Sequence, residues 1–176
     1  QSGVERSGEP ITLPVATERK LQSGDLVHME INGRWKGYMI DICRSTVIGT
    51  PSAEQARLLN TILQMLETTV TAARDGVVAE QLEHLAAEVA REANLAQHFT
   101  LAYGGPGTYL GHSIGLGTDE PPLLMQGDKT PLKAGMVITF EPGLYRTTVG
   151  GARIEDEILI LKDKAISLNV SSRRWW

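Results

Sequence analysis

Five separate segments of the chain each carry one side chain that can bind a hard or borderline divalent metal ion. Four of these side chains are carboxylates and one is an imidazole, and most of them interrupt short apolar runs. They are Glu30, Asp41, His112, Glu141 and Glu155. Carboxylate oxygens and imidazole nitrogens are common ligands of such ions in proteins. Because the residues are far apart in the sequence, folding must bring them together. The resulting pocket would hold one or two ions and activate a water molecule.

The first two acids lie on segments that are predicted to pair as β-strands. Glu30 stands between two apolar residues, and Asp41 stands in the apolar run 38–42. A carboxylate in such a run is costly to bury unless it is paired or coordinated. Across a hairpin two carboxylates approach each other, and their repulsion favours a cation between them. The alternative is a structural salt bridge in which Arg44 is the partner of Asp41.

The other three candidates also have less specific interpretations. His112 lies among glycines, where a packed histidine or a tight turn is as typical as a ligand. Glu141 ends an apolar run just before Pro142 and Gly143, so an exposed turn acid is the alternative to a catalytic one. Glu155 is followed by two further acids, a pattern that a solvated acidic face also produces.

The elements that must position these side chains follow from hydrophobic periodicity. Residues 1–24 are punctuated by glycine and proline and are predicted to be mainly loop. A strand is predicted to begin at 26–31, with a hairpin turn at Asn32-Gly33 and a return strand over about 37–48.

Two helices are predicted to follow the hairpin. Ser52 and Gln55 have the spacing of a capping box, and apolar residues then recur at helical spacing as far as Val70. Residues 75–76 end this helix. A second helix is predicted with its apolar face between 82 and 93.

The remainder of the chain is predicted to form short strands and loops. The strands are expected near 99–102, 112–116, 136–140 and 153–161, and the loops at 104–107 and 121–122. This order favours an α+β fold with a mostly antiparallel sheet over a doubly wound parallel one. With 176 residues, 41% of them hydrophobic, the chain 1–176 is predicted to be a single domain.

Composition excludes several classes of function. A net charge of −4 and the lack of a basic run argue against nucleic-acid binding. No apolar stretch approaches the roughly 20 residues that span a bilayer, and no signal peptide is visible, so no membrane partner is expected. Cys43 is the sole cysteine, which fits a reducing, cytoplasmic location. Strand alternation places Cys43 on the same side as Asp41, where a buried structural thiol is expected.

In order and spacing, the motifs resemble those of a known family. They are GD at 24–25 with Glu30 and Asp41 after it, then GHSIGL and DEPP, then FEPGLY, then RIED. The family is that of the pita-bread metallopeptidases, which include methionine aminopeptidases, prolidases and Xaa-Pro aminopeptidases, with creatinase as a metal-free relative. The resemblance covers about 2–168. It implies a pita-bread fold, here without the first helices and strand of that fold.

The resemblance also implies a dinuclear site for Mn, Co, Zn or Fe. Asp41, His112, Glu141 and Glu155 match four of the family's ligands. In the family pattern Asp41 and Glu155 would bridge the two ions, and Glu141 would handle the proton of the activated water.

Three residues depart from the family pattern. Glu30 stands where the first ligand is aspartate, and its extra methylene adds ~1.5 Å of reach, which would shift, weaken or remove one ion. Asp119 stands where peptidases of the family have a histidine that donates a hydrogen bond to the substrate. Ile11 stands where a second histidine is usual.

The chain also begins later than the family's catalytic domain. Association with a second copy or with a missing N-terminal segment is therefore expected. The leading hypothesis is a metal-dependent hydrolase related to Xaa-Pro peptidases, acting on a peptide or small amide. The alternatives are a metal-independent, creatinase-like hydrolase of a small carbon–nitrogen substrate and a pita-bread domain kept as a binding module.

Overall fold

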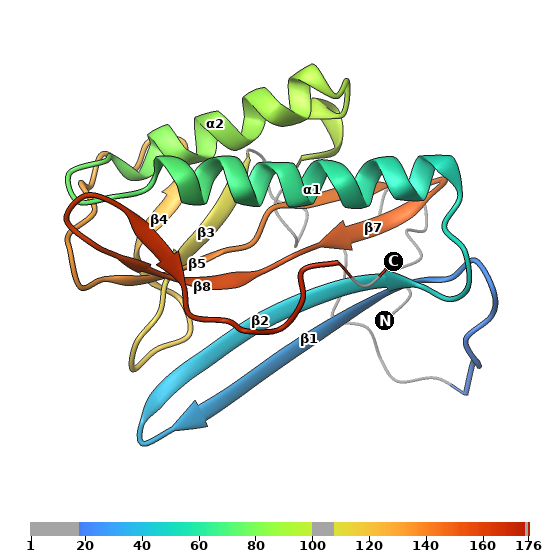
Figure 1. Ribbon diagram of the computed structural model, residues 1–176, viewed down its shortest axis with the longest axis horizontal. Coiled ribbons are helices and arrows are strands. Elements are labelled where there is room, and N and C mark those ends of the chain that lie inside the picture. Colours follow the sequence, from blue (N-terminus) through green and yellow to red (C-terminus); the bar gives the residue numbers. More distant parts are fainter. Residues whose placement is uncertain (1–17, 100–107, 175) are drawn as a thin grey trace.

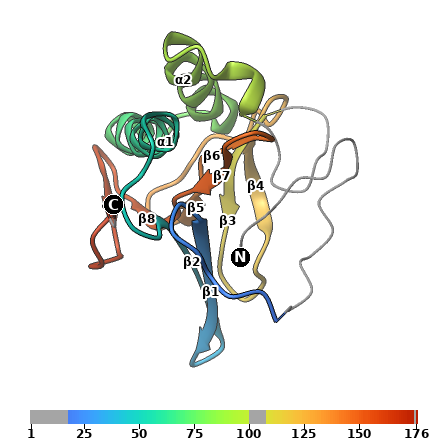
Figure 2. The same cartoon turned by 90° about the vertical axis from the view of Figure 1, so that its right-hand side faces the viewer.

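Two helices lie side by side over one face of a β-sheet, and a long hairpin projects from the opposite side (Figure 1, Figure 2). The computed structural model describes residues 18–99, 108–174 and 176. Segregation of helices to one face of antiparallel strands makes the fold α+β, as predicted.

The hairpin consists of β1 (Leu26–Trp35) and β2 (Tyr38–Val47), which pair antiparallel. Its turn lies at Lys36 and Gly37, whose φ angles of 49° and 91° suit a two-residue turn. The turn predicted at Asn32-Gly33 is therefore wrong. Asn32 lies inside β1, and its side-chain amide donates a hydrogen bond to Asp41 across the ladder.

The helices begin and end near their predicted boundaries. The first is α1 (Ala53–Ala72), and the predicted capping box is confirmed. The backbone N–H of Gln55 donates to Ser52 Oγ over 3.2 Å, and Ser52 N–H donates to Gln55 Oε1 over 2.9 Å. The second helix, α2 (Ala79–Glu92), packs against α1.

The main sheet has five strands in the order β4-β3-β5-β8-β9, and every neighbouring pair is antiparallel. Its strands are β3 (Tyr109–Ser113), β4 (Glu120–Met125), β5 (Val137–Phe140), β8 (Asp156–Ile160) and β9 (Ala165–Ser167). A separate pair consists of β6 (Gly143–Arg146) and β7 (Gly150–Arg153), and a short 3-10 helix, η1, spans Ala96–His98.

Predictions for the segments around β3 and β4 have different outcomes. The loop predicted at Pro121-Pro122 is wrong, because both prolines lie in β4. That strand is at the edge of the sheet, where the absence of a proline N–H is tolerated. The strand predicted near 99–102 and the loop at 104–107 fall mainly on residues outside those described.

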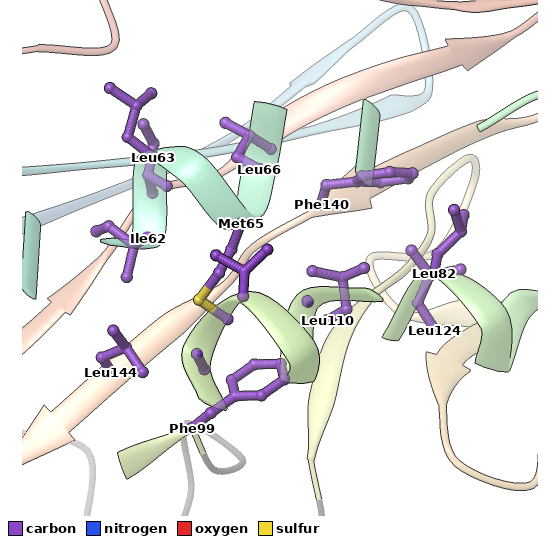
Figure 3. Close-up of a cluster of buried hydrophobic side chains, with 14 of the residues drawn as sticks. Ile62, Leu63, Met65, Leu66, Leu82, Phe99, Leu110, Leu124, Phe140 and Leu144 are labelled. Atoms are coloured by element: carbon purple, nitrogen blue, oxygen red, sulfur yellow. The ribbon is translucent and has the colours of Figure 1, made fainter. Parts of the chain in front are cut away.

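The hydrophobic core lies between the helices and the sheet (Figure 3). From α1, Ile62 and Leu66 are fully buried, and they share this core with Leu110 of β3 and Phe140 of β5. Burial of such side chains contributes about 1.5–3 kcal/mol each. Because the helices cover one face only, polar side chains can gather on the opposite side of the sheet, towards the hairpin.

Candidate metal centre

The site begins where the hairpin meets the main sheet. Glu155 directly precedes β8, and its backbone N–H donates to the carbonyl of Cys43 in β2 over 3.0 Å. Since side chains alternate along a strand, Asp41 and Cys43 share one side of β2. This single bridge therefore places the carboxylates of Asp41 and Glu155 next to each other.

His112 approaches these acids from β3, an interior strand of the main sheet. Its Nδ1 lies 3.0 Å from the carbonyl oxygen of Ser113. A carbonyl only accepts hydrogen bonds, so Nδ1 carries the proton in this contact and Nε2 faces the acids. Nε2 lies 3.4 Å from Glu141 Oε1 and 3.4 Å from Asp119 Oδ1.

Asp41, His112 and Glu155 together form a group that suits a metal ion. One ligand atom from each lies within 4.8 Å of the others, and all three residues are buried. In the described part of the chain, Glu155 Oε2 has no hydrogen-bond partner. A buried carboxylate oxygen without a donor is costly, and coordination would remove that cost. The donor set of two carboxylates and one imidazole therefore fits a divalent ion.

Glu30 lies next to Asp41 and also contacts two further side chains. Its Oε2 lies 3.1 Å from His28 Nε2 and also contacts Nη2 of Arg153. It forms a second set of close ligand atoms with His28 and Cys43. The structure thus brings three of the five predicted ligands into one group: Asp41, His112 and Glu155. Glu141 contacts His112. Glu30 lies in a neighbouring position.

Arg153 is a functional candidate that the sequence interpretation missed. This buried side chain lies at the end of β7, with Nη1 3.3 Å from Glu141 Oε2 and Nη2 3.9 Å from Glu155 Oε2. Together with its contact to Glu30, these distances make it the shared counter-charge of three acids. The available signal was the arginine that opens the RIED motif, a cation flanked by apolar residues.

Crowding of the carboxylates changes their acidity. Burial, with the charges of Glu30 and Glu141, raises the pKa of Asp41 to about 7. Burial and the charge of Glu141 raise the pKa of Glu155 well above its usual range. Burial also raises the pKa of Glu141, although Arg153 acts in the opposite direction. These acids therefore bind protons more readily than ordinary carboxylates when no cation is present.

The pKa of Glu30 is lowered, in contrast to those of its neighbours. Burial alone would raise its pKa, but His28 and Arg153 outweigh burial and lower the pKa to about 2. The Glu30 carboxylate is thus ionised under the conditions in which its neighbours tend to be protonated.

Arg44 does not pair with Asp41, so the salt bridge considered for that acid is wrong. Arg44 Nη2 lies 2.7 Å from Asp156 Oδ1, and both side chains are almost completely buried. Arg44 Nη1 also donates to the carbonyls of Cys43 and Glu155, over 2.8 and 2.6 Å. Arg44 therefore ties the backbone of β2 to the start of β8, where the metal-capable residues meet.

The remaining candidates lie at the margin of the site. Asp119 Oδ1 lies 3.4 Å from His112 Nε2, and its side chain is 70% exposed, so it lies on the solvent side of His112. Ile11 lies outside the described residues. The solvated acidic face considered for Glu155 is wrong, because Glu155 and the adjacent Asp156 are each 1% exposed.

Comparisons with known proteins give matches over most of the chain. Residues 4–162 match the pattern of metallopeptidase family M24. The Xaa-Pro dipeptidase of Pyrococcus furiosus is 36% identical over 169 residues, which is 95% of this chain and 47% of that protein. The chain thus spans less than half the length of this relative.

Solved structures show the same fold. The prolidase from Pyrococcus horikoshii has a TM-score of 0.85 at 34% identity, covering 93% of this chain and 46% of that one. The dipeptidase PepE from Mycobacterium ulcerans has a TM-score of 0.82 at 36% identity, covering 90% of this chain and 41% of that one. The pita-bread architecture predicted from the motifs is confirmed.

Replacement of Arg44 by methionine should destabilise the protein strongly. It leaves the buried carboxylate of Asp156 without its main counter-charge, which typically costs about 3–5 kcal/mol. Arg173 binds the other oxygen of Asp156 but is 27% exposed, so Arg173→Met should cost only about 0–1 kcal/mol. Urea unfolding of both variants measures the difference, and equal losses would contradict a specific role for Arg44.

In the metal-free protein, Asp41→Asn should stabilise the fold increasingly as the pH rises. The pKa of Asp41 is about 7 in the folded protein and about 4 in an unfolded chain. Its contribution to stability is therefore complete below about pH 4 and is lost as the pH rises through about 7. Asparagine does not ionise and is not subject to this loss.

Urea unfolding in a chelator at about pH 5 and about pH 8 tests this expectation. The stability gap between the variant and the wild type should widen by more than about 1 kcal/mol. Asp75→Asn, an exposed acid outside the site, serves as the matched control. A gap that stays constant between the two pH values would show that Asp41 is not the group responsible.

Proposed function

Because the chain belongs to metallopeptidase family M24, we propose that it hydrolyses peptide bonds, with Xaa-Pro dipeptides as the first substrate class. The proposal is carried by one observation, the buried group of Asp41, His112 and Glu155, and the motif resemblance matches these residues to three of the family's ligands. It is supported by relatives named Xaa-Pro dipeptidase that match most of the chain.

The metal would be held by the buried group, with Glu141 completing it. His112 Nε2 faces the site because Nδ1 is engaged by the carbonyl of Ser113. Glu155 Oε2 has no hydrogen-bond partner among the described residues. When bound, one or two divalent ions of Mn, Co, Zn or Fe would lower the pKa of a water molecule and polarise the scissile carbonyl.

Glu141 is the residue best suited to move the proton. Its pKa is raised mainly by burial, so it can accept a proton at neutral pH and return it to the leaving amine. Arg153, 3.3 Å away, orients the carboxylate from the side opposite His112. The chain's own residues thus supply an oriented acid–base group next to the candidate ligands.

The outer side of the pocket is where a substrate would approach. Asp119, 3.4 Å from His112 Nε2, is an exposed group on that side.

Among the described residues, no helix has the length and apolarity that crossing a bilayer requires. The creatinase-like and binding-module alternatives have less support, since the relatives reported above are named as dipeptidases or prolidases.

The first test measures metal content and turnover together. The purified protein is incubated with Mn(II) or Co(II), analysed by mass spectrometry and assayed with Xaa-Pro dipeptides. We expect bound metal and hydrolysis in the wild type and loss of an ion in His112→Ala. Glu141→Gln should lower kcat by about 10²–10⁴-fold, as is typical for loss of a general acid–base group.

His84→Ala is the matched control, because this exposed histidine of α2 lies outside the site. It should bind metal and turn over substrate like the wild type. Absence of bound metal under all conditions, with no hydrolysis, would refute the proposal and favour the binding-module alternative.

Asp119→His should raise the activity of the protein on Xaa-Pro dipeptides. Aspartate at this exposed position is an acceptor when ionised, whereas an imidazole can donate a hydrogen bond to a substrate carbonyl. One added hydrogen bond of this kind corresponds to a gain in kcat/KM of about tenfold. Asp119→Asn removes the charge without adding an imidazole and separates the two effects. An unchanged kcat/KM in Asp119→His would mean that Asp119 does not face the substrate.

A further inference from the structure

A second group of metal-capable side chains lies on the hairpin beside the site described above. His28 and Glu30 alternate along β1, and Cys43 lies directly opposite Glu30 in β2. The alternation of strand side chains places all three on the same face of the hairpin. The group therefore combines an imidazole, a carboxylate and the only thiol of the chain.

Two distances within this group are close to those in a tetrahedral metal site. His28 Nε2 lies 3.1 Å from Glu30 Oε2 and 3.4 Å from Cys43 Sγ. One ligand atom from each residue lies within 4.8 Å of the others. A zinc ion with ordinary bond lengths to nitrogen, oxygen and sulfur keeps neighbouring ligand atoms ~3.3–3.6 Å apart. Only small side-chain shifts would be needed to close the three ligands around an ion.

An unsatisfied buried oxygen borders the same place. Glu155 Oε2 has no hydrogen-bond partner among the described residues, and Glu155 is 1% exposed. Nη2 of Arg153 contacts Glu30 and lies 3.9 Å from this oxygen. The backbone of Glu155 is bonded to that of Cys43. The carboxylate of Glu30, and that of Glu155 when it is ionised, thus place negative charge next to the thiol, and a cation bound there would add to the compensation that His28 and Arg153 provide.

The longer side chain at position 30 gives this group its carboxylate. Glu30 stands where the family pattern has aspartate, and the added methylene extends its reach by ~1.5 Å. In the structure that reach is directed to His28 and Arg153.

We propose that His28, Glu30 and Cys43 bind a thiophilic divalent ion such as Zn²⁺ or Co²⁺, at a position separate from the group of Asp41, His112 and Glu155. A thiolate ligand favours these ions over Mn²⁺ or Mg²⁺. On binding, the Cys43 thiol gives its proton to solvent and the thiolate coordinates the ion. The side chains of His28 and Glu30 are 19% and 33% exposed, so an ion can enter and a water molecule can complete the coordination.

Cobalt(II) spectroscopy tests this site independently of peptidase activity. A thiolate bound to Co(II) gives an intense charge-transfer band in the near ultraviolet, whereas carboxylate and imidazole ligands alone give only weak visible bands. The full chain is titrated with Co(II) in the presence of a phosphine reductant. We expect the band to saturate with one equivalent of ion bound at the thiol.

Three variants assign the band to its ligands. Cys43→Ser and His28→Gln should each lose it, and His28→Gln does so without altering the buried core. His112→Ala should retain the band, because that residue belongs to the other group. This last variant also separates the two proposals, since failure of the peptidase site leaves the thiolate band intact.

Two results would overturn the inference. One is cobalt bound to the wild-type protein without a near-ultraviolet band. The other is a band of undiminished intensity in His28→Gln, which would show that the thiol binds cobalt without the proposed partner.

Discussion

Three carboxylates, those of Asp41, Glu141 and Glu155, are buried close enough to repel one another when they are ionised. Folding can tolerate this arrangement only if protons, a basic side chain or a metal ion offset the charge. Arg153 supplies part of the compensation, while burial and the neighbouring carboxylates raise the pKa of Glu155. Binding of a cation among these carboxylates would therefore reduce their repulsion and increase the free energy of unfolding.

The geometry that enforces this crowding is a junction between two sheets. The hairpin strand β2 contributes Asp41, the main sheet contributes His112, and the bridge from Cys43 to Glu155 joins them. Arg44 secures the junction by bonding to backbone carbonyls on both sides. Buried ion pairs add little net stability over apolar packing. The main effect of Arg44 is therefore to fix the backbone of β2 relative to the start of β8.

Departures from the family pattern are concentrated at the edge of the site rather than in its buried centre. Asp41, His112 and Glu155 are grouped as a metal-binding centre requires, whereas Glu30 is paired with His28 and Arg153. Asp119 stands where the motif resemblance implies a histidine, and its side chain is 70% exposed. The residues of the buried centre therefore match the family pattern, and the differences lie in the side chains around it.

Local features were determined by the sequence alone. The capping box at Ser52, the helical periodicity that follows it and the candidate ligand residues depend on neighbours a few positions away, so they can be read directly. The hairpin turn was misplaced because Asn32-Gly33 is locally the stronger signal, yet the hydrogen bond from Asn32 to Asp41 needs both residues inside the strands. Only the tertiary structure decided that Arg44 pairs with Asp156 and that Glu30 joins His28 and Cys43. Such choices depend on competition for buried charge among distant segments, such as Arg44 and Asp156, which are 112 positions apart, and no local pattern encodes it.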